Sequence, residues 1–475
     1  MINRFILFIL LTISVVSCID DSFTTSPSDQ PRFSVDTLKM GVVFTDEMTT
    51  THRFTVINPA SKSLTISNIA LSGENSQYFR LNVDGFSGKD FHNVEIRGKD
   101  SIYVFVEATL PATDADMPVE VETHIDFLTN GVTRSVVVNA SGQDLIRLKD
   151  QTISEDTEFK PGKPYRIVDS LVVAPEATLR VAAGTRLLFH DKASLIVYGT
   201  LICEGTVDEP VTLSGDRTGN VVTDISFDLM SRQWEGVEFR PGSQGNSLTN
   251  TIIKNTVNGV YIDGENEAAT LTMVNCRLRN SGSTVLTAVH SQVDAVGCEF
   301  AESAAGLVYL HGGSHTFNHC TFANYYLFSV ISGPAIAFGH ADDKTADETS
   351  LPLLHADISN SIIYGLGSDL SHNDLTGMDI MIRNCLIKSN GTDDDNFINC
   401  IWGEDPLYYT VRNDYIFDYR LRDESPAIAA ANPSLTRPEA NTDGYGLSRG
   451  SQPDLGAYVY TPSEEEGSSA SFRPL

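Results

Sequence analysis

The chain has 475 residues, of which 41% are hydrophobic and 20% are charged, and these proportions are typical of folded rather than disordered proteins. Its 33 basic and 62 acidic residues give a formal net charge of −29, which excludes the basic footprint of a nucleic-acid-binding protein. The length predicts two or three folded units. Because long stretches of strong helix formers are missing, a helical bundle is not expected.

The first seventeen residues have the pattern of a secretory signal peptide. Arg4 supplies a positive charge, and an apolar run from Phe5 to Val16 follows it. Twelve residues in a helix span about 18 Å, which is too short for a bilayer core of about 30 Å. A short apolar segment before a small residue is typical of a peptide that is removed during secretion.

The end of this segment, Val15-Val16-Ser17-Cys18, resembles the lipobox of bacterial lipoproteins. The resemblance implies that Cys18 becomes the first mature residue and carries acyl chains that hold the protein to a membrane. Ordinary secretion with an incidental cysteine is the alternative. Asp20 and Asp21 resemble signals for surface display in some Gram-negative lipoproteins, or they belong to a solvated linker. We therefore expect an outer-membrane lipoprotein of a Gram-negative bacterium, facing the surface or the periplasm, with residues 18–31 as a flexible tether.

Residues 32–146 predict a β-sandwich, because apolar and polar residues alternate with a period of two in short runs between turn residues. Such runs include Arg53–Ile57, Leu64–Ile66, Ser101–Val106 and Ser135–Val138. Their order, from FTVINPASKSLTISNIAL to the closing VVVNASG, resembles the immunoglobulin-like domains of the abnormal-spindle and choice-of-anchor type. Those domains are mostly spacers or adhesion modules, and the resemblance implies such a role here.

An internal repeat is visible around three cysteines that are 22 residues apart. Apolar residues recur three positions before each cysteine and two positions after it. Three further segments of the sequence fit the same alignment, and each of the six aligned segments is called a frame. Because the first of these spacings breaks the period of two, we expect two short strands to meet at a bend just before the cysteine. The cysteine positions of the six frames form a predicted inward ladder of small residues: Thr251, Cys276, Cys298, Cys320, Ser361 and Cys385.

The residue immediately before this ladder is Asn, Gly or His in all six frames. These residue types adopt positive φ more readily than others, so one left-handed residue is predicted at each bend. The column resembles the asparagine-rich corner of right-handed parallel β-helices, whose coils stack about 4.8 Å apart. The predicted turn ladder consists of Asn250, Asn275, Gly297, His319, Asn360 and Asn384.

The resemblance to parallel β-helix proteins extends to both ends of the repeat region. Residues 165–215 resemble the opening coils of extracytoplasmic right-handed β-helix proteins, and the run SRGSQPDLGAYVY resembles the closing segment of choice-of-anchor β-helix proteins. We therefore predict an all-β chain with a right-handed parallel β-helix over residues 147–460 and an acidic, Ser-rich tail over 461–475. Residues 340–350 interrupt the repeat, and the 41 residues from Cys320 to Ser361 fit either two coils or one coil with a long loop.

Acidic residues, cysteines and histidines are the side chains of this sequence that could bind a metal ion. Ca²⁺ takes six to eight oxygen ligands, and the acidic run at 393–395 offers some of them, although a solvated loop is the alternative. The chain has no CxxC motif, so zinc is not expected and the ladder cysteines should be buried thiols. His311, His315 and His319 would share a face only on a helix, and a strand–turn coil scatters them. The only candidate metal ligands are therefore Asp393, Asp394 and Asp395.

No catalytic constellation emerges from the sequence. Lyases and glycosidases of the β-helix fold use carboxylates beside a basic residue or paired carboxylates, and Arg277 and Arg279 have no matching Asp set in neighbouring coils. We therefore expect a lipid-anchored envelope protein, without a cofactor, that presents a β-helix for binding glycans or other extracellular partners. The alternatives are a divergent polysaccharide lyase or glycoside hydrolase of this fold and a structural stalk or adhesin.

Overall fold

The computed structural model describes residues 22–222, 225–264, 270–339, 354–371, 375 and 378–462. The chain divides into two compact units, Met1–Asp144 and Leu145–Leu475, which are described separately. Within the described residues, no helix has the length and apolar character needed to cross a membrane. Four sequence predictions lie outside the described residues: the signal peptide, lipidation of Cys18, the insertion at 340–350 and nearly all of the acidic tail.

The first unit consists of two five-stranded sheets that enclose one apolar core. All strand pairs are antiparallel except β2–β10, which is parallel. The two-sheet architecture agrees with the predicted sandwich, whereas its immunoglobulin-like class stays a prediction. The first sheet contains β1 (Arg32–Phe33), β3 (His52–Ile57), β8 (Ser101–Ala108), β5 (Phe79–Val83) and β6 (Phe86–Gly88), in that order. The second contains β2 (Thr37–Phe44), β10 (Val132–Gln143), β9 (Val119–Thr129), β4 (Leu64–Ser72) and β7 (Asp90–Ile96).

The described part of the predicted tether, residues 22–31, packs against the sandwich. Thr24 is buried, and its backbone N–H donates to the carbonyl of Ser63 over 2.9 Å. The side chain of Asn130 donates to the carbonyl of Ser26. Residues 22–31 are therefore packed onto the sandwich by backbone hydrogen bonds that a periodicity argument does not reveal.

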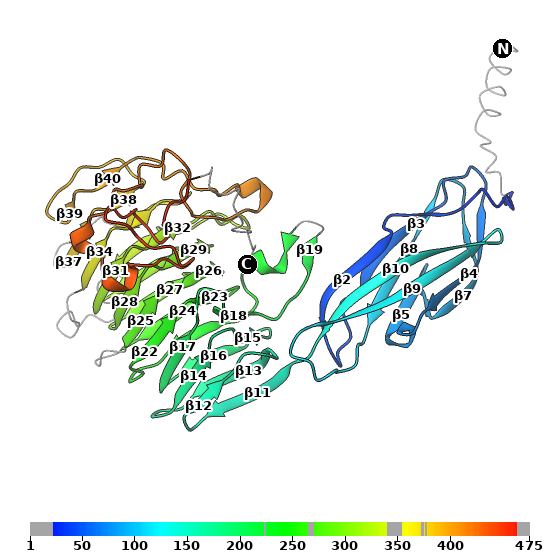
Figure 1. The fold of residues 1–475 in the computed structure, drawn as a ribbon, viewed down its shortest axis with the longest axis horizontal. Helices are drawn as coiled ribbons and strands as arrows, with labels where there is room; N and C mark the ends of the chain where they lie inside the picture. Colours follow the sequence, from blue (N-terminus) through cyan, green and yellow to red (C-terminus); the bar gives the residue numbers. More distant parts are fainter. Residues whose placement is uncertain are drawn as a thin grey trace, which may run out of the picture. The chain divides into compact units, whose positions relative to one another are not determined.

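The second unit is a parallel β-helix, which confirms the predicted fold (Figure 1). The chain runs through three faces, and most coils contribute one short strand to each of them. The first face contains β12 (Thr157–Phe159), β14 (Thr178–Ala182), β17 (Thr200–Glu204), β22 (Asn246–Thr249), β25 (Thr270–Val274), β28 (Gln292–Val296), β31 (Ser314–Asn318), β34 (His355–Ser359), β37 (Asp379–Arg383) and β39 (Phe397–Ile398).

The other two faces are joined into one sheet by the long strands β11 (Ile146–Ile153) and β13 (Tyr165–Val173). The second face contains β15 (Arg186–Phe189), β18 (Val211–Gly215), β23 (Thr251–Lys254), β26 (Arg277–Ser281), β29 (Glu299–Ser303), β32 (Thr321–Ala323), β35 (Ile362–Ile363), β38 (Leu386–Ile387) and β40 (Ile401–Trp402). The third contains β16 (Ser194–Val197), β21 (Gly236–Phe239), β24 (Val260–Asp263), β27 (Leu286–Val289), β30 (Val308–His311), β33 (Ile336–Gly339) and β36 (Leu370–Ser371).

The strand register follows the repeat frame read from the sequence. The residues three positions before the ladder pair directly across the first face, in the order Leu248, Met273, Ala295, Phe317, Ile358 and Ile382. The residues two positions after the ladder pair in the same way across the second face, in the order Ile253, Leu278, Phe300, Phe322, Ile363 and Ile387. Both columns are buried in one continuous core.

The 41 residues from Cys320 to Ser361 make one coil rather than two. β31 pairs with β34 and β32 pairs with β35, so no additional coil lies between them. A second insertion, between β18 and β21, carries the antiparallel pair β19 (Asn220–Val222) and β20 (Ile225–Ser226) and the short helix η2 (Phe227–Leu229).

The C-terminal segment, residues 404–462, covers part of the second face. It contains three short 3₁₀ helices, η3 (Arg412–Asp414), η4 (Pro433–Leu435) and η5 (Pro438–Ala440), and the sandwich contains one more, η1 (Ser76–Tyr78). Tyr408, Tyr419 and Tyr458 pack in one cluster with Ala301 and Ala323 from β29 and β32. The small side chains of these strands therefore leave room for the tyrosines that cover them.

Candidate functional site

The six residues of the predicted turn ladder all have positive φ, between 41° and 66°. At Gly297 a side chain would also collide with the preceding coil, because an added Cβ would lie 2.2 Å from Oδ1 of Asn275. Several ladder residues hold the C-terminal segment: Asn275 donates to the carbonyl of Thr442, and Asn360 donates to that of Asn432. The ladder therefore has a structural role in turning the coil and docking the segment that covers it.

We expect Asn275→Val to destabilise the β-helix much more than Asn275→Gly. A β-branched residue at φ 53° is strained by roughly 1–3 kcal/mol, whereas glycine adopts this conformation freely. Both variants lose the hydrogen bond to Thr442, so the difference between them isolates backbone strain. Thermal unfolding followed by circular dichroism measures it, and equal melting temperatures would contradict the stacked-turn account.

The inward ladder is completely buried, as its six residues have no exposed surface. The six cysteines of the described ranges are free thiols. Sγ of Cys298 accepts the backbone N–H of Cys276 at 3.4 Å, and Oγ of Ser361 accepts that of Cys320 at 3.0 Å. Burial raises the pKa of Cys276 and Cys298 well above the usual thiol value. These side chains are thus internal hydrogen-bonding and packing groups, and reactive thiolates are not expected at neutral pH.

The three clustered histidines do not converge on one point. His311 contacts the hydroxyl of Tyr309, His315 donates from Nε2 to the carbonyl of Gly312, and His319 contacts Thr436. Burial lowers the pKa of His315 to about 4 and that of His319 to about 2. Both rings are therefore neutral at physiological pH and act as internal polar groups.

The carboxylates of the acidic run at 393–395 do not converge on one point. The carboxylate of Asp393 accepts the backbone N–H groups of Asn399 and Cys400, and that of Asp394 accepts those of Asn396 and Phe397. Within the described residues, no group of three or more His, Cys, Asp or Glu side chains is placed to hold a metal ion. Asp393 and Asp394 are occupied in shaping their own loop, and Asp395 does not combine with them into a ligand set.

A buried ionic cluster on the second face was missed by the sequence analysis. Arg279 of β26 forms an ion pair with Glu299 of β29, a partner that the sequence search for an aspartate set did not consider. The matching groups are glutamates of the next coil rather than aspartates. Tyr458 donates to Glu299 over 2.5 Å, and Tyr419 donates to Glu302. The C-terminal segment therefore closes directly over both carboxyl groups.

Glu302 is an unusual residue for its position. It lies four positions after the ladder, where three of the other five frames have Asn255, Asn280 and Asn324 and the last two have Gly365 and Ser389, and it has φ 42°. A glutamate with positive φ is uncommon, and such strain concentrates at functional or tightly determined sites. Among the residues that the structure describes, its Oε2 has no hydrogen-bond partner, and burial, opposed by Arg279, raises its pKa to about 8. A glutamate between the asparagines of the coils before and after it, Asn280 and Asn324, is the sequence signal that identifies this residue.

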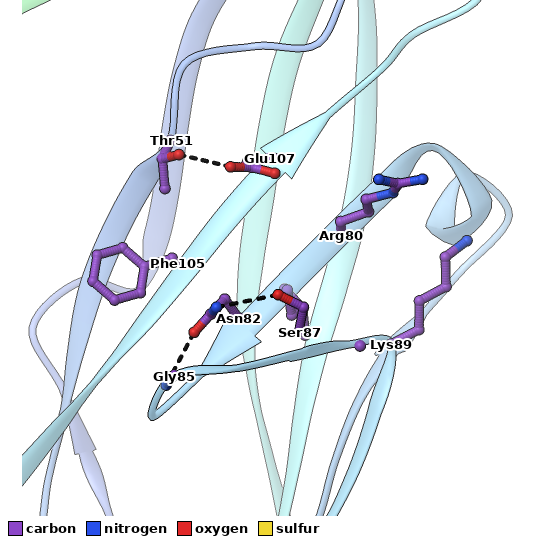
Figure 2. A pocket seen from close by; sticks show the side chains of 10 residues that line it. Thr51, Arg80, Asn82, Gly85, Ser87, Lys89, Phe105 and Glu107 are labelled. Atoms are coloured by element: carbon purple, nitrogen blue, oxygen red, sulfur yellow. Dashed lines mark hydrogen bonds between the residues drawn. The ribbon is translucent and has the colours of Figure 1, made fainter.

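A second candidate site is a depression on the outer surface of the first unit, with a volume of about 610 Å³ (Figure 2). Strand alternation explains its lining, because Phe79, Leu81 and Val83 of β5 point into the core while Arg80 and Asn82 point outward. Across the sheet, Asn82 pairs with Phe105, and Arg80 pairs with Glu107. The lining residues are Thr51, Arg80, Leu81, Asn82, Gly85, Ser87, Gly88, Lys89, Phe105 and Glu107.

Hydrogen bonds fix several of these side chains. Oγ1 of Thr51 donates to Glu107 over 2.7 Å, Asn82 donates to Ser87 over 3.2 Å, and Oδ1 of Asn82 accepts the backbone N–H of Gly85 (Figure 2). Phe105 contributes a half-buried ring to the same surface. The depression thus combines a half-buried aromatic ring with hydroxyl, amide and charged groups carried on strands.

Comparison with known proteins gives only distant structural similarities. No family model matches the chain, and no curated protein matches it. The catalytic unit of a thermostable GH87 α-1,3-glucanase from Streptomyces thermodiastaticus is 11% identical over 73% of this chain and 75% of its own, with a TM-score of 0.26. A GH87 α-1,3-glucanase catalytic domain in complex with nigerose is 8% identical over 75% of this chain and 88% of its own, with a TM-score of 0.19. A family 123 glycoside hydrolase from Clostridium perfringens is 11% identical, and the match covers 24% of this chain but only 26% of that hydrolase, with a TM-score of 0.17. These values assign no family and no activity to the chain.

Proposed function

We propose that this protein is a lipid-anchored protein of the bacterial cell envelope that binds glycans without cleaving them. The observation that carries the proposal is the depression on the sandwich, where the ring of Phe105 lies among the hydrogen-bonding side chains of Thr51, Asn82 and Ser87. Sugars present a C–H face and several hydroxyl groups, and an aromatic ring beside fixed donors and acceptors complements both.

The buried carboxyl groups favour binding over catalysis. A carboxyl with a pKa near 8, such as that of Glu302, has the protonation state of a general acid at neutral pH. Tyr419 and Tyr458 cover this group and its neighbour Glu299, so a glycosidic bond has no access to them while the C-terminal segment is docked. Polysaccharide cleavage would require that segment to leave.

Retention of the full chain on immobilised polysaccharides tests the proposal. We expect retention that Phe105→Ala weakens, while Tyr198→Ala, which removes an exposed aromatic ring of the second unit, leaves it unchanged. Release of new reducing ends, with or without Ca²⁺, would instead support the degrading alternative. Absence of retention on every polysaccharide would favour a structural stalk or adhesin.

We expect Cys18→Ala to abolish retention in the membrane fraction. The predicted signal segment is too short to span a bilayer, so the acyl chains on Cys18 would be the anchor. Fractionation of cells and labelling with palmitate measure the effect, and Cys400→Ala is the matched cysteine control. Unchanged fractionation, or palmitate incorporated into the Cys18 variant, would contradict the lipoprotein assignment.

A further inference from the structure

The depression on the sandwich is positively charged, although the unit that carries it is acidic. Residues 22–144 contain nine Lys and Arg and sixteen Asp and Glu residues. The depression nevertheless has two cations, Arg80 and Lys89, and one anion, Glu107. This local excess of positive charge attracts a negatively charged ligand, whereas the acidic surface around the depression repels such a ligand.

The charged groups of the depression differ in whether they already form hydrogen bonds within the protein. Glu107 accepts a hydrogen bond from Thr51, and Lys89 donates to the carbonyl of Gln77 over 3.0 Å. In the described part of the chain, Arg80 forms no hydrogen bond and no ion pair, and it is exposed on β5. Although Glu107 is its cross-strand partner, no ion pair joins the two. The guanidinium group is thus available to an incoming anion.

The two cations lie together at one side of the depression, away from the ring of Phe105 (Figure 2). Asn82 and Ser87 lie between the cations and the ring. A ligand that fills this space meets a charged group at one end, polar groups in the middle and an apolar ring at the other end. A planar guanidinium binds a carboxylate through two parallel hydrogen bonds, so it is well suited to the charged end.

We propose that this depression binds a uronic acid residue of an acidic glycan, with the carboxylate on Arg80, a second charge contact from Lys89 and a sugar face on Phe105. The inference rests on the proposed glycan-binding function and gives it a substrate class. A sulfated sugar shares the negative charge and is separated from a uronic acid by the experiment below.

The experiment compares a glucuronate-containing oligosaccharide with its carboxyl-reduced counterpart, which keeps every ring hydroxyl and has a neutral hydroxymethyl group in place of each carboxylate. Titration calorimetry on the full chain should show binding of the acidic form about tenfold tighter or more, since a hydrogen bond to a charged group is worth about 1.5–3 kcal/mol. Arg80→Gln should remove this preference, Arg80→Lys should keep part of it, and Lys89→Gln should reduce it. Arg32→Gln and Lys39→Gln, exposed cations of the same unit outside the depression, should leave it unchanged.

The outcomes separate the inference from the function on which it rests. Equal binding of the two oligosaccharides, weakened by Phe105→Ala, would overturn the acidic-sugar assignment and retain glycan binding. Binding of neither would remove both. Equal loss in the Arg80 and Arg32 variants would mean general charge attraction, and tighter binding of a sulfated oligosaccharide than of the glucuronate would also overturn the assignment. Circular dichroism of each variant verifies that the sandwich is folded.

Discussion

Cys298→Asp is expected to unfold the centre of the β-helix, whereas Cys298→Ser should be tolerated. The side chain of Cys298 is completely buried between Cys276 and Cys320 in adjacent coils, where a carboxylate would meet no cation. An uncompensated buried charge costs roughly 3–5 kcal/mol even after the protein relaxes. Because each coil contacts only its neighbours, the damage should spread along the array from this point.

Serine is the appropriate control because the chain already uses it at an equivalent position. The hydroxyl of Ser361 accepts the backbone N–H of Cys320, and a serine at 298 can accept that of Cys276 in the same way. We expect Cys298→Ser to cost about 1 kcal/mol or less, from the smaller volume of the hydroxyl. Urea unfolding of both variants measures the difference, and similar midpoints would mean that position 298 does not face the core.

Thiol labelling provides a second measurement of the same burial. In the folded wild type, Cys276, Cys298 and Cys320 should not react with a thiol reagent, because they are buried and the pKa of the first two is raised. All three should react after unfolding. Rapid labelling of the folded protein would place the ladder on the outside of the coil.

The sequence pattern predicts the β-helix well because its signal repeats locally. Residue types that favour positive φ recur at one spacing in the turn ladder and report the same local geometry in each frame, so the six frames reinforce each other. The pairing register of β25, β28 and β31 then follows directly, since residues such as Met273, Ala295 and Phe317 must share the inside of the coil.

Both candidate sites depend instead on contacts between segments without a shared period. The depression brings together Arg80 of β5 and Phe105 of β8, which become neighbours only through antiparallel pairing. The buried cluster joins Glu302 to Tyr419, 117 residues later in a segment without regular strands. The column containing Glu302 was visible in the repeat, but its partner tyrosines were not, because nothing local specifies which face an irregular segment covers.

Glu302→Gln is expected to stabilise the second unit at neutral and mildly alkaline pH. The group has a pKa of about 8 in the folded protein against 4.5 without perturbation, because burial penalises its charged form. The folded state therefore keeps a proton that the unfolded state releases, so the free energy of unfolding falls as pH rises from about 4.5 to 8. One pKa unit corresponds to about 1.36 kcal/mol, which makes the penalty on the order of 3 kcal/mol at pH 7. Glutamine imitates the neutral carboxyl and can still accept the hydrogen bond from Tyr419.

The useful range for this measurement is pH 6.5–8. Below pH 6.5, His315 and His319 take up protons in the unfolded chain, whereas their pKa values are lowered in the folded protein. Their contribution to stability is therefore lost as pH falls, and the free energy of unfolding changes with pH in the opposite direction to that caused by Glu302. Other groups close to Glu302 are Arg279, Glu299 and Tyr419. Within this range the wild type should lose about 2 kcal/mol of stability as pH rises, and Glu302→Gln should lose much less.

Glu299→Gln is the matched control: it breaks the ion pair with Arg279 and should destabilise the protein. Parallel pH profiles for wild type and Glu302→Gln would show that Glu302 is already ionised in the fold, with Arg279 compensating its charge.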